Sequence, residues 1–482
     1  MAYGVLRRLD LHLSVNSVKY KCLAAESGSE PRADCLRLSL SLLLMPMTTS
    51  RNGSSNGRTA VLVDGCRLPF QRAGTGYTDL MAYDMGRMVL KGLLRRTELD
   101  PALVDRVVMG CVIQDVETSN VAREAALGAG IPKHVPAFTV TMACISSNQA
   151  VTSGVDLIRA GLADRVIAGG TETMSDPPIR VKRSVRKRLF KAQKARNPGD
   201  YLELLKGLGP ADLLPEAPSI AEFSTGEVMG ESADKLAAMF GVSRREQDEY
   251  ALLTHHRAAE AQEDGRLDKE LVPATPPPTF DPITTDNVVR PNTSMEKLEG
   301  LSPAFVKPFG TVTAGNASAL TDGASASLLM AHDVAKADGY TPIAALRDYT
   351  FVAQDPGEEL LLGPAYAIPQ VLDAAGLTLD DVDVIELHEA FAGQVLAVLE
   401  ALRTQTFAEE SLNRTEPVGD VDMDRLNVRG GSVSLGHPFG ATGARLVTTA
   451  ANRLYEEDGQ WALVAACAAG GQGHAMLIER LD

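Results

Sequence analysis

The chain has 482 residues, 45% of them apolar and 23% charged, which is typical of a globular protein with two or three domains. Its formal net charge of −15 argues against nucleic acid as a general partner. The sequence contains no run of about 18 apolar residues, so it predicts no membrane-spanning helix. The cysteines form no CxxC pair and no ligand-like spacing with histidine, which predicts a reducing compartment, no disulfide framework and no metal site. They are Cys22, Cys35, Cys66, Cys111, Cys144 and Cys467.

Residues 1–57 differ from the rest of the chain. A short stretch rich in Leu and Ser (36–47) precedes a polar segment rich in Gly and Ser (48–57) that is typical of a linker. The apolar stretch is too short to cross a membrane, and the acidic residues before it argue against a transit peptide. We expect a disordered extension without a function of its own, which translation from Met45 or Met47 would omit.

From Arg58 onwards, β-favouring apolar runs alternate with segments of helical periodicity. This alternation predicts an α/β fold with a mostly parallel sheet and helices on its faces. The predicted strands lie at 59–65, 106–112, directly before Cys144, and at 165–169, and the predicted helices at 79–95, around 124–128, and directly after Cys144.

Cys144 lies between a β-favouring segment and an apolar pattern at helical spacing. The pattern predicts a strand, a tight turn and a helix with Cys144 at or near its N-terminus. Unpaired backbone N–H groups and the helix dipole at that position favour a thiolate over a thiol. Taken alone, the segment is also compatible with a small buried cysteine that has no chemical role.

The order of predicted elements recurs late in the chain. Residues 99–108 end a helix and open a strand, and residues 377–386 repeat this template. The first copy is followed by the Cys144 turn, a helix and a strand. The second is followed by the segment 432–438, a helix and a strand at 463–467. Two α/β halves of similar order predict an internal duplication.

The segment from Asp176 to about Pro308 has a different character. It contains a strongly helical stretch (243–265) and a proline-rich connection (273–278), which together predict an inserted helical and loop-rich domain. Between Arg180 and Arg196 it carries nine Lys and Arg residues and no acid. This basic run is either a solvated helix face or a contact for phosphate, an anionic membrane surface or an acidic partner.

Four segments combine glycine with reactive side chains: 310–318, 388–392, 430–443 and 467–473. None is a GxGxxG or P-loop motif, so dinucleotide binding and nucleotide hydrolysis lack support. The segments place His388, His437 and Cys467, together with Cys144, at the ends of predicted strands, where open α/β sheets hold their sites. Such a set supplies a nucleophile, a base, a second thiol that can move a proton, and a donor for an oxyanion.

These motifs, in this order, resemble those of the thiolase family from about Arg58 to the C-terminus. Within the family, the chain is most similar to the group of the trifunctional-protein beta subunit and the bacterial fatty-acid-oxidation 3-ketoacyl-CoA thiolases. With that group it shares the segments 139–150, 175–180 and 222–230, and His at position 388. The motifs of the whole family lie at 142–146, 169–175, 310–318, 388–391, 436–438 and the glycine turn after Cys467.

The resemblance implies a five-layered α-β-α-β-α fold built from two duplicated α/β halves with an inserted helical and loop-rich domain. We expect four parts: a disordered extension (1–57), an N-terminal half (58–175 with 309–333), an inserted loop domain (176–308) and a C-terminal half (334–482).

The resemblance also implies the activity of a 3-ketoacyl-CoA thiolase (acetyl-CoA C-acyltransferase) in fatty-acid β-oxidation. Cys144 would attack the 3-ketoacyl-CoA and form an acyl-thioester, and His437 would take the Cys144 proton. Cys467 would protonate the departing acetyl-CoA carbanion, because a thiol pKa near 8.5 can be brought close to the working pH. His388, with a water, would stabilise the enolate oxygen. CoA is a substrate, and no cofactor and no metal is expected.

Two further positions follow from the resemblance. The backbone N–H groups of Cys144 and Ala469 would hold the tetrahedral oxyanion, and Ser318 matches a serine that contacts pantetheine. His388 stands where most thiolases carry Asn, and Ala469 where most carry Gly, so the donor at the enolate differs and the turn must accommodate a Cβ. Both departures also occur in the trifunctional-type group.

As partners we expect CoA thioesters, a second copy of the chain in a homodimer, an alpha subunit with hydratase and dehydrogenase activity, and peripheral membrane contact through Arg180–Arg196, but no nucleic acid. The location would be cytoplasmic in a bacterium and mitochondrial in a eukaryote. The alternative function is a biosynthetic, acetoacetyl-CoA-forming acetyl-CoA acetyltransferase. Condensing enzymes of acyl-carrier-protein thioesters lack a second catalytic cysteine such as Cys467, and a non-enzymatic relative would be expected to have lost a reactive residue.

Overall fold

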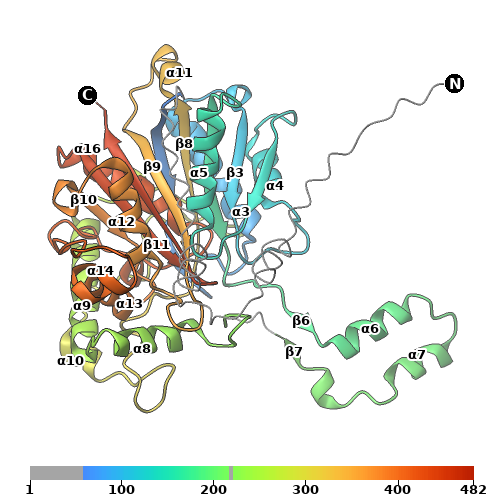
Figure 1. Cartoon of the computed structure of the whole chain (residues 1–482). Coiled ribbons are helices and arrows are strands. Elements are labelled where there is room, and N and C mark those ends of the chain that lie inside the picture. The colour runs from blue at the N-terminus through green and yellow to red at the C-terminus, as the bar shows by residue number, and fades with distance from the viewer. Residues whose placement is uncertain (1–57, 217–220, 482) are drawn as a thin grey trace, which may run out of the picture. The chain divides into compact units, whose positions relative to one another are not determined.

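The computed structural model describes residues 58–216 and 221–481, so the predicted extension at 1–57 lies outside the described residues. Figure 1 shows a large β-sheet structure with helices on both sides and between its two parts. The strand order is β10-β11-β12-β9-β1-β8-β5-β3-β4, and β2 pairs with β8. The strands are β1 Ala60–Arg67, β2 Gln71–Arg72, β3 Arg106–Gly110, β4 Ala137–Val140, β5 Arg165–Glu172, β8 Thr321–Ala331, β9 Ala344–Ala353, β10 Val384–Leu387, β11 Trp461–Ala468 and β12 Gln472–Arg480.

The sheet has two parts because β9 and β1 pair through only two positions, Val61 with Ala345 and Leu62 with Ala344. One part belongs to the C-terminal segment (β10, β11, β12, β9) and the other to the N-terminal segment (β1, β8, β5, β3, β4). Helices α5 Ser146–Arg159 and α16 Thr442–Glu456 contact both each other and strands of the sheet. They share one apolar cluster with residues of both parts, including Leu62, Val155, Val447 and Val464.

Two further helix layers cover the outer faces. Helices α3 Ala82–Thr97 and α4 Val121–Ala129 pack on the N-terminal part, and α12 Gly363–Ala375 and α13 Ala392–Arg403 lie over the C-terminal part. The result is the five-layered α-β-α-β-α arrangement that the resemblance implied. The central helices approach each other closely: a Cβ at Gly443 would lie 2.6 Å from the backbone nitrogen of Asn148, so only glycine fits there.

The predicted duplication is visible in the element order. The template at 99–108 follows α3 and forms a 3₁₀ turn at Pro101–Leu103 and the start of strand β3. Its repeat at 377–386 follows α12 and forms a 3₁₀ turn at Leu379–Asp381 and strand β10. Predicted and observed ends of the strands and helices differ by only a few residues. The exact division of the chain into two halves and an insertion stays a prediction.

The prediction of a mostly parallel sheet was wrong. The pairs β3–β4, β3–β5 and β10–β11 are parallel, whereas β1–β8, β1–β9, β5–β8, β9–β12 and β11–β12 are antiparallel. The turn between β11 and β12 is too short for the crossover that parallel strands need. Strand β8 was not predicted at all, because its sequence TDGASASLLMA is rich in small residues of low β propensity. Its position in the middle of the sheet nevertheless buries all of it.

The segment between the halves contains an arm and a helical part. The arm consists of β6 Arg180–Val181, α6 Arg183–Ala192, α7 Pro198–Leu205 and β7 Pro215–Glu216, and extends away from the layers in Figure 1. Helices α8 Met229–Met239, α9 Arg244–Glu263 and α10 Met295–Glu299 follow. The predicted helical stretch 243–265 is α9, which begins with a reciprocal Ser243–Glu246 capping box. Within the described part of the chain, no helix is long and apolar enough to cross a membrane.

Candidate active site

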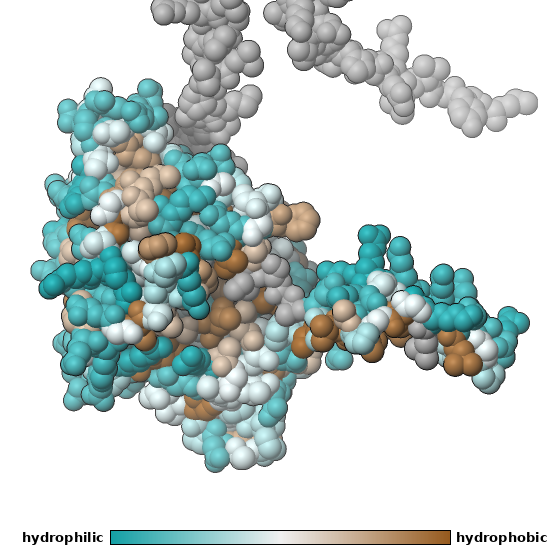
Figure 2. All heavy atoms as spheres, turned by 90° about the horizontal axis from the view of Figure 1, so that it is seen from below, coloured by the Kyte–Doolittle hydropathy of each residue, from teal (hydrophilic) through white to brown (hydrophobic). Residues whose placement is uncertain are grey.

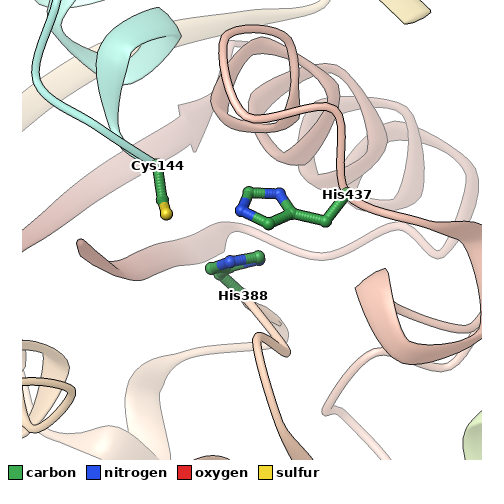
Figure 3. Close-up of side chains that lie close together, drawn as sticks. All are labelled: Cys144, His388 and His437. Carbon is green, nitrogen blue, oxygen red and sulfur yellow. The ribbon is translucent and has the colours of Figure 1, made fainter. Parts of the chain in front are cut away.

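Three reactive side chains from distant segments meet between the two parts of the sheet. Cys144 directly precedes α5, His388 follows β10, and His437 lies between α15 Ser432–Leu435 and α16. The Cys144 sulfur and one ring nitrogen from each histidine all lie within 4.8 Å of one another. The centroids of the two imidazole rings are 4.1 Å apart. Figure 3 shows both rings beside the Cys144 sulfur. The structure therefore brings together three of the four reactive residues that the sequence singled out.

A tight turn places Cys144 at the start of α5. Ala143 adopts a left-handed conformation (φ 47°), which is uncommon for a residue with a side chain. The Ser146 hydroxyl donates to the Ala143 carbonyl at 2.7 Å and accepts from the Met142 N–H at 2.8 Å. The helix begins at Ser146, so the predicted strand, turn and helix are confirmed, with Cys144 just outside the first turn. The turn holds the half-buried thiol against the two histidines.

The thiol itself rests in the protonated form, contrary to the expectation of a thiolate at a helix N-terminus. Burial raises the pKa of Cys144 to about 11, although hydrogen bonds from the backbone N–H groups of Ala469 and Cys144 act to lower it. The backbone effect that the sequence indicated is present, but desolvation of the charged sulfur is larger. A neighbouring base is therefore needed to make Cys144 a nucleophile.

His437 has the features of that base. Its Nδ1 lies 2.6 Å from the Thr442 hydroxyl oxygen, and this hydroxyl donates to the Pro438 carbonyl at 3.0 Å. Since a hydroxyl has only one proton, Thr442 accepts from Nδ1–H, and we assign the free lone pair of His437 to Nε2. Burial and then the charge of Arg445 lower the pKa of His437 to about 3, so the ring is neutral.

His388 is the second neutral imidazole. It is fully buried, and its Nδ1 lies 2.9 Å from the Ser432 hydroxyl oxygen. Burial, followed by the charges of His437 and Arg445, holds the pKa of His388 well below its ordinary value. Its Nε2 has no hydrogen-bond partner within the described residues. A buried ring nitrogen without a partner is available to a bound substrate.

Cys467, the fourth residue, ends strand β11 and is buried. Burial and then the charge of Cys144 raise the pKa of the Cys467 thiol above its ordinary value. The two cysteines are therefore close enough to influence each other, and Cys467 remains a thiol near neutral pH. Cys144, His388 and His437 are also residue types that bind zinc, and the expectation of no metal stays a prediction.

The turn after Cys467 carries the second backbone donor expected from the resemblance. The backbone N–H of Ala469 acts to lower the pKa of the Cys144 thiol. The left-handed conformations of this turn fall on Gly470 (φ 86°) and Gly471 (φ 63°) rather than on Ala469, so position 469 accommodates its Cβ. The next amide, Gly470 N–H, donates to the Glu222 carboxylate at 2.7 Å. Sequence reasoning did not assign Glu222 to this turn.

Ser318 lies beside the His388 segment. Its N–H donates to the Ala390 carbonyl at 3.0 Å, and the adjacent Ala317 bridges to Phe391. The side chain is half-buried. The loop 310–318 thus borders the site, and the contact of Ser318 with pantetheine stays a prediction.

Two buried carboxylates hold the site together, and sequence reasoning missed the role of both. Glu172 accepts from the N–H groups of Val112, Ile113 and Gly440, which joins the His437 loop to the N-terminal part, and burial raises its pKa to about 7. Glu389, next to His388, has a similar role. It accepts from the Tyr250 and Thr254 hydroxyls, the Asn427 amide and the Val433 N–H. An acidic residue inside a run of small and apolar residues was the available signal for both.

A five-layered duplicated fold, with a cysteine beside two neutral histidines where its halves meet, defines an acyl-transferring enzyme. Comparison with known proteins agrees. Residues 60–333 match the model of the thiolase N-terminal domain and residues 340–480 that of the thiolase C-terminal domain. The chain belongs to the thiolase family and is an acyltransferase.

Individual relatives cover most of the chain. Mitochondrial trifunctional enzyme subunit beta of Mus musculus is 55% identical over 424 residues, 88% of this chain and 89% of the relative. A 3-ketoacyl-CoA thiolase of Yersinia pestis (strain Pestoides F) is 44% identical over 423 residues, 88% of this chain and 97% of the relative. The crystal structure of human mitochondrial 3-ketoacyl-CoA thiolase superimposes with a TM-score of 0.74 at 33% identity, covering 88% and 99% of the two chains.

Proposed function

We propose that the chain is an acetyl-CoA C-acyltransferase of fatty-acid β-oxidation, which cleaves 3-ketoacyl-CoA with CoA to acyl-CoA and acetyl-CoA. The observation that carries this proposal is the Cys144 thiol, protonated at rest, with the lone pair of His437 beside it. The name of the Yersinia pestis relative, a 3-ketoacyl-CoA thiolase, supports this substrate class.

The first half-reaction forms the acyl-enzyme. His437 Nε2 takes the Cys144 proton, and the thiolate attacks the keto carbon of the substrate. The backbone N–H groups of Cys144 and Ala469, both of which act to lower the pKa of the Cys144 thiol, stabilise the developing oxyanion. When the C2–C3 bond breaks, the enolate of acetyl-CoA leaves, with its oxygen stabilised by His388, and Cys467 donates its proton to C2.

The second half-reaction releases the acyl group. The Cys467 thiolate takes the proton of the incoming CoA thiol, and the CoA thiolate attacks the acyl-thioester. Cys144 leaves and recovers its proton from His437, which restores all groups. The raised pKa of Cys467 suits this role, because the side chain must be a thiol when it protonates the carbanion. CoA is a substrate in this scheme, and no step uses a cofactor.

Two substitutions test the roles of the cysteines. Cys144→Ala should abolish CoA-dependent thiolysis and the attachment of an acyl label to the protein, and retained labelling would contradict the nucleophile assignment. Cys467→Ala should still accept an acyl group from a simple thioester but lose cleavage of the carbon–carbon bond. Equal loss of both half-reactions would show that the division between the two thiols is wrong. A rate profile across 3-ketoacyl-CoA chain lengths separates this function from an acetoacetyl-CoA-specific one.

We propose a homodimer that forms through the open edge of the sheet. Strand β4 has a neighbour, β3, on one side only, and it lies directly before the Cys144 turn. Phe138 on this strand is 39% exposed. An uncovered strand edge presents unpaired backbone groups to another chain. Light scattering during size-exclusion chromatography should show a dimer, and a monomer at micromolar concentration would contradict the proposal.

We propose that the arm contacts an anionic membrane surface peripherally. Its nine cations between Arg180 and Arg196 adjoin exposed apolar side chains, and Figure 2 shows the hydrophobic groups along one side of the arm and the hydrophilic ones along the other. Such an arrangement favours the interface of an anionic bilayer. The apolar residues, each more than half exposed, are Ile179, Leu189, Phe190, Tyr201, Leu202, Leu213 and Leu214.

Vesicle sedimentation tests this contact. Binding to phosphatidylserine vesicles and not to phosphatidylcholine vesicles is expected, with loss of binding in a variant that reverses the charges of Arg183, Arg186 and Lys187. Arg188 is left intact, because it donates to the Leu204 and Lys206 carbonyls and thereby joins the two helices of the arm. Unchanged binding of the variant would exclude the arm. A changed Michaelis constant for CoA would instead assign these charges to the substrate phosphates.

We also propose a partner subunit that carries hydratase and dehydrogenase activities. The support is the name of the Mus musculus relative, a beta subunit of a trifunctional enzyme. Co-purification from the native source, followed by assay of the three activities in one fraction, tests it. The same relative is named mitochondrial, and we propose that location for a eukaryotic source and the cytoplasm for a bacterial one.

A further inference from the structure

A network of fully buried polar groups contacts Nδ1 of His388. The Ser432 hydroxyl oxygen is 2.9 Å from His388 Nδ1 and 3.1 Å from an Nη atom of Arg445. Arg445 also pairs with Glu386 at 3.4 Å, and Glu386 pairs with Arg453 at 2.9 Å. All of these side chains are inaccessible to solvent. Because these groups are closed off from solvent, the positions of the protons in this hydrogen-bond network follow from its own donors and acceptors.

We propose that Ser432 and Arg445 are positioning residues that hold His388 as the neutral tautomer with its proton on Nε2. The proposal rests on the function proposed above, in which His388 stabilises the enolate oxygen. A guanidinium group only donates, so Ser432 accepts from Arg445. The single proton of the Ser432 hydroxyl then has one acceptor among its contacts, His388 Nδ1. The imidazole proton must therefore reside on Nε2.

The opposite tautomer leaves a proton without a partner. If Nδ1 carried the proton, the Ser432 oxygen would accept from both His388 and Arg445, and its own hydroxyl proton would have no acceptor within the described residues. In that tautomer the Nε2 lone pair has no partner within the described residues either, whereas the proposed tautomer leaves only the Nε2–H group unpaired until a substrate oxygen binds. Each unsatisfied buried polar group costs about 1–3 kcal/mol. Arg445 thus controls the tautomer indirectly, because it determines which way the hydroxyl of Ser432 points.

The adjacent His437 is held in the opposite state by a different contact. Its hydroxyl partner, Thr442, donates to the Pro438 carbonyl and can only accept from the ring. His437 therefore presents a lone pair to the site, whereas His388 presents an N–H. Two imidazoles 4.1 Å apart become a base and a hydrogen-bond donor, although their residue type is the same. This arrangement explains how His388 can take a place at which other thiolases carry the permanent donor Asn.

A double-mutant cycle tests the proposal. Ser432→Ala should lower the rate of carbon–carbon cleavage by about ten- to a hundredfold, less than the 10²–10³ typical of deleting an oxyanion donor, and should leave acyl transfer from a simple thioester within about twofold. In a His388→Asn background, Ser432→Ala should change the cleavage rate by less than about twofold, since an amide donates whatever lies behind it. Ser432→Thr, which keeps the hydroxyl, should restore most of the rate.

Nitrogen-15 spectra of the unsubstituted protein, labelled at histidine, give a readout that does not depend on the folding of a variant. The His388 signals, identified by their loss in His388→Asn, should show a protonated Nε2 and an unprotonated Nδ1. A protonated Nδ1, or equal loss of rate by Ser432→Ala in both backgrounds, would overturn the proposal. If thiolysis survives Cys144→Ala while the spectra show Nε2–H, the proposed function fails and only the assignment of the His388 tautomer stands.

Discussion

The Thr442 hydroxyl offers the most selective test of the acid–base chemistry of His437. Thr442→Val keeps the shape of the side chain and removes the oxygen that lies 2.6 Å from Nδ1. The Pro438 carbonyl, the other partner of this hydroxyl, keeps its hydrogen bonds from the N–H groups of Ala441 and Thr442 at 2.9 and 3.0 Å. The substitution removes two hydrogen bonds of the hydroxyl, and of the two partners only His437 Nδ1 is left without another hydrogen bond.

The size of the effect follows from the charge that His437 acquires. When the ring takes the Cys144 proton, the bond from Nδ1–H to Thr442 becomes a charge-assisted hydrogen bond. Hydrogen bonds to charged groups contribute about 1.5–3 kcal/mol, and each 1.36 kcal/mol corresponds to about a tenfold change in rate. We expect acylation of Cys144 to slow by about 10- to 150-fold, with little change in the binding of CoA.

Single-turnover release of acetyl-CoA from a 3-ketoacyl-CoA measures this step, and the rate of Cys144 alkylation by iodoacetamide provides a second readout. Thr448→Val is the matched control, because Thr448 lies on the same helix and is also buried. Among the described residues, the one side chain that forms a hydrogen bond with its hydroxyl is Ser327, at 3.4 Å. If both variants lost the same rate, or if Thr442→Val acylated as fast as the unsubstituted enzyme, the assignment of His437 as the base would be refuted.

Three predictions concern stability. Burial lowers the pKa of His437 and of His474 to about 3, against about 6.5 in an unfolded chain. The free energy of unfolding is therefore unaffected by these histidines above about pH 6.5, and it decreases as the pH falls toward 3 because the unfolded chain binds protons first. Urea unfolding should show a decline of about 1.4 kcal/mol per pH unit for each histidine, and His474→Leu should reduce that slope. Gly443→Ala places a Cβ 2.6 Å from the backbone of α5 and should cost about 1–3 kcal/mol, with an unchanged unfolding midpoint contradicting the close approach of the helices. Arg453→Met removes a buried partner of Glu386 and should lower the unfolding free energy by about 3–5 kcal/mol; a loss below about 1 kcal/mol would mean that Arg445 alone satisfies this carboxylate.

The elements around Cys144 could be predicted from the sequence because their signals are local. A β-favouring run, a cysteine and an apolar pattern at helical spacing gave β4, the turn and α5 close to their observed bounds. The duplication could be predicted for the same reason, since the template at 99–108 and its repeat at 377–386 each contain a complete local unit. Strand β8 could not, because Ala, Ser and Gly acquire a β conformation there only through pairing with β1 and β5.

The sequence by itself indicated an α/β fold with an internal duplication, and its resemblance to thiolases implied the layer architecture, the family and the candidate reactive residues, since motif order is a property of the chain alone. Only the tertiary structure decided the protonation states and hydrogen-bond partners of those residues. Burial between the halves keeps Cys144 a thiol at rest. The hydroxyls of Thr442 and Ser432, which no motif singled out, give two neighbouring histidines opposite proton positions. The physical reason is that desolvation and proton placement depend on which distant segments surround a group, and these become neighbours only in the folded chain.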